Sequence, residues 1–256
     1  MTNQSTRSTS LFAKILRTID GVRRLTINLL FLAVLLILLV IVWQQDTVEV
    51  PESAALILDP RGQIVEQLSG TSRQRALQEL AGATQSETLL KDLVDAIELA
   101  REDDRIKALF LNLNGMGAAG LTKLQDLGQA IRFFRESGKK VVAAANDYEQ
   151  SPYYLASMAD EIYLDPFGMV ILEGYSRYRT YYKEGLDRLE VDWNVFRVGE
   201  YKSAVEPFLR NDMSPEAREA NLEWLNDLWQ AYLNDVAPAR GMTPEELEET
   251  VNSFAT

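Results

Sequence analysis

The chain has 256 residues and contains no histidine and no cysteine. Serine–histidine triads, cysteine nucleophiles and ordinary structural zinc sites are therefore excluded, and acid/base chemistry would have to use Lys, Asp, Glu, Tyr, Ser or Thr. The formal net charge is −12, distributed as +4 on residues 1–24 and −16 on residues 44–256. An acidic body of this size repels phosphate backbones, which argues against a nucleic-acid partner.

An apolar run, Leu25 to Trp43, follows the basic start. As a helix it would span roughly 28 Å, close to the hydrocarbon thickness of a bilayer, with Trp43 at the interface. A cleavable secretory signal shares these features, but Trp-Gln-Gln-Asp follows the run here instead of a small-x-small cleavage pattern. We therefore expect an uncleaved single-pass anchor over 25–43, with residues 1–24 cytoplasmic and the main domain in the periplasm of a bacterium. The lack of cysteine suits such an oxidising compartment.

Beyond a short linker at 44–53, segments with strand and helix patterns alternate. Strands are expected at 54–58, 64–67, 106–113, 141–145, 161–164, 169–172 and 192–198. Helices are expected at 86–101, 121–137, 153–159, 176–189, 215–240 and from Thr243 onward. Residues 68–85 are expected to form an irregular surface segment. This alternation predicts an α/β domain over 54–256, in which a parallel sheet is covered on both faces.

The last two predicted helices carry clear end signals. Ser214-Pro215 is typical of a helix start, Gly241 of a helix end, and Thr243 to Glu246 of a capping box. Between them an apolar stripe is predicted to face the core or a neighbouring subunit, formed by Leu222, Leu225, Leu228, Trp229 and Leu233. The chain stops soon after the last helix begins, so we expect a piece of a longer protein.

Lys202 is the strongest candidate for a catalytic residue. It follows a predicted strand and precedes 204–209, where a helix can begin, and α/β folds often place active-site residues at such transitions. A lysine that acts as a general base near neutral pH needs a pKa about three units below its usual value of roughly 10.4. Burial could lower the pKa, and the apolar neighbours that would provide it are Val198, Tyr201, Val205 and Phe208. Without further context, a lone lysine is usually a solvated surface charge.

The run FRVGEYKSAVEPF around Lys202 resembles a motif of the signal peptide peptidase A family (protease IV), in its long two-halved bacterial form. The resemblance extends over nearly the whole chain, through LTKLQDLGQAIRFFRESGKKVVAAAND, SPYYLASMADEIYLDPFG, YYKEGLDRLEV and NDMSPEAREANLEWLNDLWQ. It implies a Clp/crotonase-like fold and a homotetramer on the outer face of the inner membrane. It also implies degradation of cleaved signal peptides, which are hydrophobic, by a serine/lysine dyad in which Lys202 is the general base.

The resemblance further implies two related halves, with the lysine in the first and the nucleophilic serine in the second. The present chain corresponds to the first half alone. Where the second half has Ser-Gly-Gly-Tyr, this sequence has Gln150-Ser151-Pro152-Tyr153, which puts Gln150 at the serine position. We therefore expect the nucleophile to lie outside this chain, which would be catalytically incompetent by itself.

Gly115 to Gly120 reads G-x-G-x-x-G between a predicted strand and a predicted helix, a pattern typical of dinucleotide sites. The acidic partner fits poorly, because Asp147 lies 27 residues after Gly120 rather than about 20. The family resemblance implies instead a non-catalytic copy of a loop that donates hydrogen bonds to the oxyanion in the other half. We expect neither a cofactor nor a metal.

The sequence thus predicts the lysine-bearing half of a membrane-anchored serine protease. One alternative is a non-enzymatic, membrane-tethered scaffold with a relict fold, if the gene ends at Thr256. Another is a crotonase-type acyl-CoA enzyme, which the acidic surface and the export signal disfavour. The remaining aromatic groups would belong to the core, to an interface or to a groove for hydrophobic peptides: Tyr153-Tyr154, 175–182, and Trp224 with Trp229.

Overall fold

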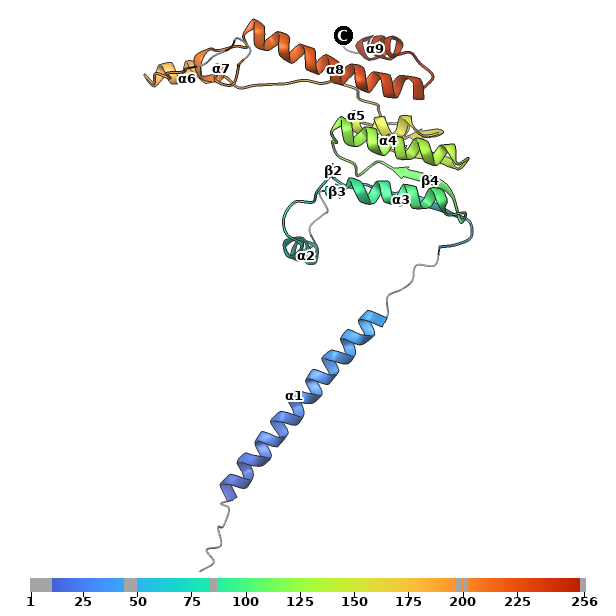
Figure 1. Ribbon diagram of the computed structural model, residues 1–256, viewed down its shortest axis with the longest axis vertical. Helices are drawn as coiled ribbons and strands as arrows, with labels where there is room; N and C mark the ends of the chain where they lie inside the picture. The colour runs from blue at the N-terminus through green and yellow to red at the C-terminus, as the bar shows by residue number, and fades with distance from the viewer. Residues whose placement is uncertain (1–10, 44–49, 83–86, 197–198, 200–201, 254–256) are drawn as a thin grey trace, which may run out of the picture. The chain divides into compact units, whose positions relative to one another are not determined.

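The computed structural model describes residues 11–43, 50–82, 87–196, 199 and 202–253, which belong to two compact units, Met1–Val50 and Pro51–Thr256 (Figure 1). The first unit contains α1 (Leu11–Trp43), which begins well before the expected anchor at 25–43. Its stretch Lys14–Val40 is long and apolar enough to cross a membrane, a property that a signal sequence near the N-terminus would share.

The second unit is built on a four-stranded parallel sheet with the strand order β1-β4-β5-β6. The strands are β1 (Ala54–Leu58), β4 (Ile106–Asn112), β5 (Lys140–Ala145) and β6 (Glu161–Leu164). A separate parallel pair consists of β2 (Gln63–Val65) and β3 (Glu87–Leu89). The predicted α/β class with a parallel sheet is therefore confirmed.

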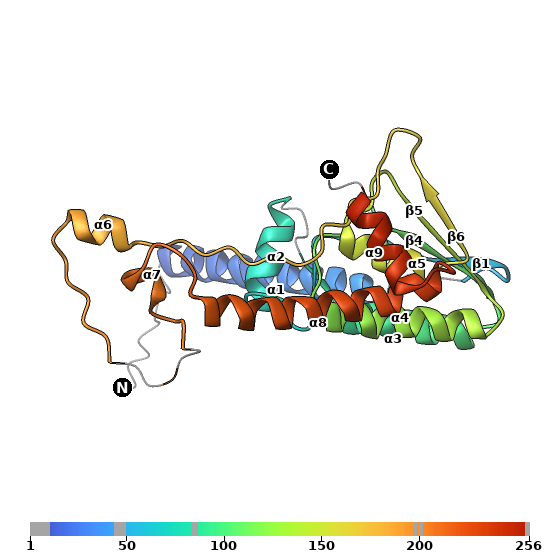
Figure 2. The same ribbon diagram turned by 90° about the horizontal axis from the view of Figure 1, so that it is seen from above.

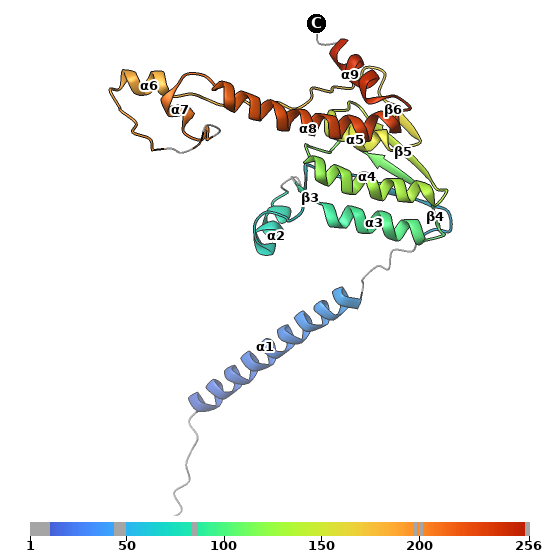
Figure 3. The same ribbon diagram turned by 45° about the horizontal axis from the view of Figure 1, so that its top comes forward.

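Three helices that precede or connect these strands lie side by side: α3 (Leu90–Glu102), α4 (Leu121–Glu136) and α5 (Gln150–Ser157) (Figure 3). Residues that alternate along β4 and β5, such as Leu109 and Val141, are fully buried, whereas the intervening Phe110 and Val142 are only half-buried. On β1, Ile57 is 63% exposed. The expected cover on both faces is thus wrong for the described residues. The strands follow one another across the sheet in chain order, and when all crossover connections are right-handed, the connecting helices lie on the same face.

Two long C-terminal segments follow, α8 (Pro215–Ala239) and α9 (Pro244–Ser253). The predicted end signals are confirmed. Ser214 Oγ accepts a hydrogen bond from the Ala217 N–H at 3.1 Å. Thr243 and Glu246 form the capping box, in which each side chain accepts a hydrogen bond from the other residue's N–H, at 2.8 and 3.2 Å.

The predicted apolar stripe of α8 is buried only toward the C-terminal end of the helix. There Leu233 is fully buried, and Tyr232 packs against Tyr154 of α5 with 5.7 Å between the ring centroids. Near the start of the helix, Leu222 and Trp224 are 52% and 41% exposed. Seen from above, this first part of α8 extends away from the sheet, and α7 lies near its start (Figure 2).

The segment between β6 and α8 differs most from the expected elements. In place of a helix over 176–189, the structure has an extended segment followed by the short α6 (Lys183–Arg188). The predicted strand at 169–172 is reduced to a single bridge between Tyr148 and Val170. Residues 192–196 of another predicted strand form none, and 197–198 lie outside the described residues. Apolar residues in this segment are often exposed, so the spacing of apolar residues did not indicate which of them are buried in this chain.

Two further differences concern the segment between β2 and α3. A helix, α2 (Ser72–Leu80), occupies part of the stretch that was expected to be irregular. The next helix, α3, begins at Leu90 and not just after Ser86, because residues 87–89 extend and pair with β2. Pairing with a distant strand has overridden the local helical pattern.

Candidate functional site

Lys202 lies in a loop between Gly199 and α7 (Glu206–Leu209), outside any helix or strand. Gly199 has a φ of 105°, a conformation that glycine adopts without strain. The side chain of Lys202 is exposed in this chain, so the burial expected of a general base is not provided by the described residues. Of the apolar neighbours expected to enclose it, two are half-buried and two lie outside the described residues: Val205 and Phe208, and Val198 and Tyr201.

The sequence analysis did not single out two side chains near Lys202: Arg179, which contacts the lysine loop (residues 202–205), and Glu206, which links the start of α7 to Ser214. Arg179 donates hydrogen bonds to the backbone carbonyls of Ser203 at 2.9 Å and Ala204 at 2.7 Å. Glu206, only 2% exposed, accepts hydrogen bonds from the hydroxyl and the backbone N–H of Ser214. No local sequence pattern predicts these contacts, because the residues that they join are 8 to 25 positions apart in the chain.

Stacked aromatic rings also hold α7 in place. The ring of Phe208 stacks on Trp193 with a centroid separation of 4.6 Å and on Tyr182 with 5.9 Å. The backbone N–H of Tyr182 also donates to the carbonyl of Pro207 at 2.7 Å. The region just after Lys202 is therefore packed against two segments that precede it in the chain.

Gln150, at the position expected for a nucleophile in the other half, has structural contacts. Its side-chain oxygen accepts a hydrogen bond from the Gly174 N–H at 2.8 Å, and its backbone carbonyl accepts one from the Tyr232 hydroxyl at 3.1 Å. The neighbouring Ser151 hydroxyl lies 3.3 Å from the Ala119 nitrogen, from which it accepts a hydrogen bond. The start of α5 thus links the glycine-rich loop to α8 and carries no activated hydroxyl.

The loop Gly115–Gly120 packs against the turn after β1. Gly117 N–H donates to the Gly62 carbonyl at 2.7 Å, and Gly62 N–H donates to the Gly115 carbonyl at 2.8 Å. A Cβ at Gly117 would lie 3.1 Å from the backbone of Gly62. The close approach of two backbones explains Gly115 and Gly117, and the Gly117 donor is already used, unlike the free amides of a phosphate cradle.

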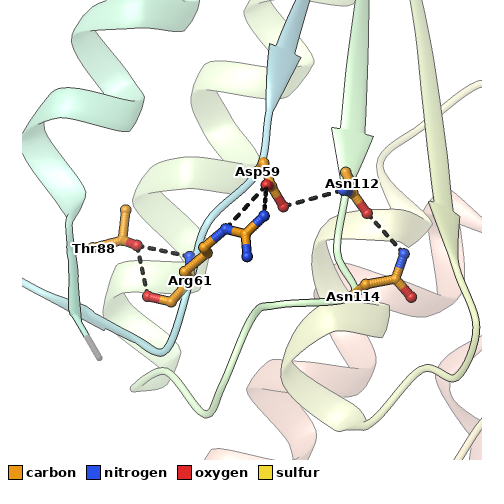
Figure 4. Close-up of polar contacts among 5 residues, drawn as sticks. All are labelled: Asp59, Arg61, Thr88, Asn112 and Asn114. Carbon is orange, nitrogen blue, oxygen red and sulfur yellow. Dashed lines mark hydrogen bonds and ion pairs between the residues drawn. The ribbon is translucent and has the colours of Figure 1, made fainter. Parts of the chain in front are cut away.

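A polar cluster lies at the carboxyl ends of β1 and β4, where α/β folds commonly place binding sites (Figure 4). Asp59 contacts Arg61 at 2.6 Å and accepts a hydrogen bond from Asn112 at 3.1 Å, and Asn112 accepts one from Asn114 at 2.8 Å. Thr88 bridges the backbone N–H and carbonyl of Arg61, each at 2.8 Å. These side chains use their polar groups in hydrogen bonds to one another. The cluster therefore connects the ends of β1 and β4 with β3 and does not present a set of unpaired groups for binding a ligand.

Other chemical possibilities are weaker. Burial raises the pKa of Tyr148 to about 12, and it also raises the pKa values of Tyr154, Tyr175 and Tyr232, so these phenols stay protonated near neutral pH. Within the described residues, no three carboxylates come together in a way that could hold a metal ion. A groove of about 590 Å³ between α3 and α4 has Glu98, Asp126 and Phe133 in its lining and does not include Lys202.

Comparison with known proteins relates the chain to peptidases. Residues 133–253, which include Lys202, match the sequence model of Peptidase family S49. The chain is 42% identical over 239 residues to "Protease 4" of Salmonella typhi and 40% identical over 232 residues to "Protease 4" of Haemophilus influenzae. These alignments cover 90% and 88% of this chain, but the chain spans only 38% of each relative.

More distant similarities were also found. The chain is 26% identical over 210 residues to "Serine protease SPPA, chloroplastic" of Arabidopsis thaliana, an alignment that covers 82% of this chain and 28% of that protein. A solved enoyl-CoA hydratase/isomerase family member is 14% identical with a TM-score of 0.30, over 64% of this chain and 74% of that one. A related structure from Silicibacter pomeroyi is 19% identical with a TM-score of 0.24, over 65% and 84%. Scores this low add no support of their own to the crotonase-like expectation.

Proposed function

We propose that the chain, of which residues 133–253 match Peptidase family S49 and which is 40–42% identical to two proteins named Protease 4, forms the lysine-bearing part of a membrane-anchored serine endopeptidase that degrades cleaved signal peptides. The observation that carries this proposal is the position of Lys202, which lies inside the family match on a loop held by specific contacts. A serine protease is the activity that the family match and the relatives' names support. The dyad, the substrate and the anchor are the finer parts of the proposal.

In the proposed mechanism, Lys202 accepts the proton of a serine hydroxyl supplied by a second half of the protein. The serine oxygen attacks the peptide carbonyl, and Lys202 then protonates the departing amine. The backbone donors that stabilise the oxyanion also come from the second half, in keeping with the use of Gly117 N–H inside this one. Lys202 is exposed in this chain, so docking of the serine-bearing half, or of a neighbouring subunit, would have to remove its amine from water and lower its pKa.

The surroundings of the enzyme are part of the same proposal. The stretch Lys14–Val40 would anchor the protein in the inner membrane of a bacterium, with the N-terminus in the cytoplasm and Pro51–Thr256 in the periplasm. Four copies would assemble into a homotetramer on that side, where hydrophobic peptides leave the membrane. A reporter fused after residue 46 should be active only as a periplasmic fusion, and activity only in the cytoplasm would contradict the orientation.

The test of the mechanism is substitution of Lys202 in the whole protein. Lys202→Ala and Lys202→Arg should both abolish cleavage of a hydrophobic peptide, because neither side chain can accept the serine proton near neutral pH, while gel filtration shows an unchanged assembly. The matched control is Lys91→Ala, which removes a lysine that is 73% exposed on α3. Cleavage by Lys202→Ala at a near-normal rate would end the mechanism.

A membrane-tethered, non-enzymatic scaffold remains the second candidate, favoured by the structural role of Gln150 at the expected serine position. The two candidates predict different gene sequences downstream of the codon for Thr256. An enzyme requires a reading frame that continues into a second α/β half with Ser-Gly-Gly-Tyr, and a scaffold does not.

A further inference from the structure

The backbone at Lys202 and Ser203 belongs to no strand or helix. The two residues lie between Gly199 and the first turn of α7. A lysine side chain has four rotatable bonds, so the place of its amine depends first on where the loop holds its Cα. Contacts from other segments must therefore fix the loop if the amine is to meet a serine from another part of the protein.

Arg179 provides the first of these contacts. Its two terminal nitrogens donate to consecutive carbonyls, those of Ser203 and Ala204, at 2.9 and 2.7 Å. A planar guanidinium that spans two carbonyls fixes the orientation of the peptide between them as well as its distance. These carbonyls belong to the two residues that directly follow Lys202, so the contact lies one and two residues after the lysine.

Glu206 provides the second contact, at the far end of the loop. Its buried carboxylate accepts hydrogen bonds from the hydroxyl and the N–H of Ser214, the residue that caps α8. Its backbone N–H donates to the carbonyl of Ser203 at 3.1 Å, the same oxygen that Arg179 contacts. The loop is thereby joined to the start of a 25-residue helix.

We propose that Arg179 and Glu206 are positioning residues for Lys202, which hold the lysine loop in the geometry that proton transfer from the serine requires. This inference rests on the proposed function. Neither side chain is required to touch the substrate. Because a misplacement of about 1 Å can lower a rate about 100-fold, loosening the loop should reduce turnover more than substrate binding.

The test uses Arg179→Met and Arg179→Lys in the whole protein, with steady-state cleavage of a hydrophobic signal-peptide sequence as the assay. We expect Arg179→Met to lower kcat about 10- to 100-fold with KM changed less than about twofold. Arg179→Lys retains one of the two carbonyl contacts and should recover part of that loss. The matched control is Arg177→Met, since Arg177 lies on the same segment but contacts Asn221 of α8 at 2.8 Å and not the loop. Glu206→Gln should lower kcat in the same direction, compared with Glu223→Gln on the exposed side of α8.

The outcomes separate three cases. A wild-type kcat for Arg179→Met, or a loss that the circular dichroism spectrum attributes to unfolded protein and that Arg179→Lys does not recover, would overturn the positioning role. Lys202→Ala is assayed in parallel. If it still cleaves the peptide, the proposed function itself fails, whereas an inactive Lys202→Ala beside a normal Arg179→Met rejects the positioning role alone. Inactive Lys202→Ala with a selective loss of kcat in Arg179→Met supports both.

Discussion

The hydroxyl of Tyr154 on α5 donates a hydrogen bond of 2.9 Å to the carboxylate of Asp235, which lies 81 positions later on α8. The same carboxylate oxygen accepts a hydrogen bond of 3.0 Å from the side-chain amide of Gln125 on α4. One acidic residue of α8 therefore joins two helices of the layer that covers the sheet. The apolar surroundings of Tyr154 raise the pKa of its phenol, so it remains a hydrogen-bond donor.

Asp235→Ala should destabilise the protein, because it leaves the buried Tyr154 hydroxyl without its acceptor. The expected loss is about 1–3 kcal/mol in the free energy of unfolding. Urea denaturation of the detergent-solubilised protein would measure it. Asp227→Ala, an exposed position on the same helix, should change the free energy by less than about 0.5 kcal/mol. Equal effects for both variants would show that the Tyr154–Asp235 contact adds no stability.

Gly117→Ala should destabilise the protein for a different reason. The added Cβ would lie 3.1 Å from backbone atoms of Gly62, which cannot rotate away as a side chain could. We expect a loss of about 1–3 kcal/mol, read as a lower midpoint in denaturant. The control is Gly185→Ala in α6, where a Cβ meets nothing within 4 Å and helix propensity favours alanine. A loss at Gly185 but not at Gly117 would contradict this explanation of the glycine-rich loop.

Ser214→Ala should cost more stability than an ordinary helix cap. The cap alone contributes about 1 kcal/mol, but the substitution also removes the hydroxyl that donates to the buried Glu206 carboxylate. The buried carboxylate keeps its hydrogen bond from the backbone N–H of residue 214 but loses the one from the hydroxyl, which brings the expected total above about 2 kcal/mol. Thr243→Ala, which removes the exposed cap of α9, serves as the comparison and should cost about 1 kcal/mol or less. Similar losses from both variants would mean that Glu206 finds other donors.

Alkaline pH should destabilise the fold through Tyr148. Its hydroxyl donates to the carbonyl of Tyr163 at 3.0 Å, and burial raises its pKa to about 12 from an unfolded value of 10.0. A raised phenol pKa means that the stabilising contribution is complete below about pH 10 and is lost as the pH rises from about 10 to about 12. Unfolding curves at several pH values in that window should show a shallower pH dependence for Tyr148→Phe than for the wild type. Identical slopes would rule out this contribution.

Local sequence signals predicted much of the fold. The buried strand β4, the helix α4 with Gly138 after it, and the caps at Ser214 and Thr243 all follow from patterns within a few residues. The segment 176–196 was predicted correctly only at 183–188, where α6 lies, because its apolar residues resemble those of core elements, although Tyr178 is 92% exposed and Phe196 is fully exposed. Hydrophobic periodicity does not say whether the partner surface belongs to the same chain.

The candidate site was likewise predicted only in part. The motif identified Lys202 as the residue to test, but the exposure of its side chain in this chain was not predicted. The contacts of Arg179 with Ser203 and of Glu206 with Ser214 could not be predicted from the sequence. Each pair is separated along the chain, and only the folded structure brings the two residues together. The polar cluster around Asp59 likewise depends on the pairing of β1 with β4.

Both ends of α8 are fastened, at Ser214 to the segment after Lys202 and at Asp235 to the helices over the sheet. Roughly 31 Å of helix lies between these two points, so a tilt of about two degrees at the Asp235 end would move the Ser214 end by about 1 Å. A small change in the tilt of α8 would therefore displace the segment after Lys202 by a distance comparable with the misplacement that lowers turnover.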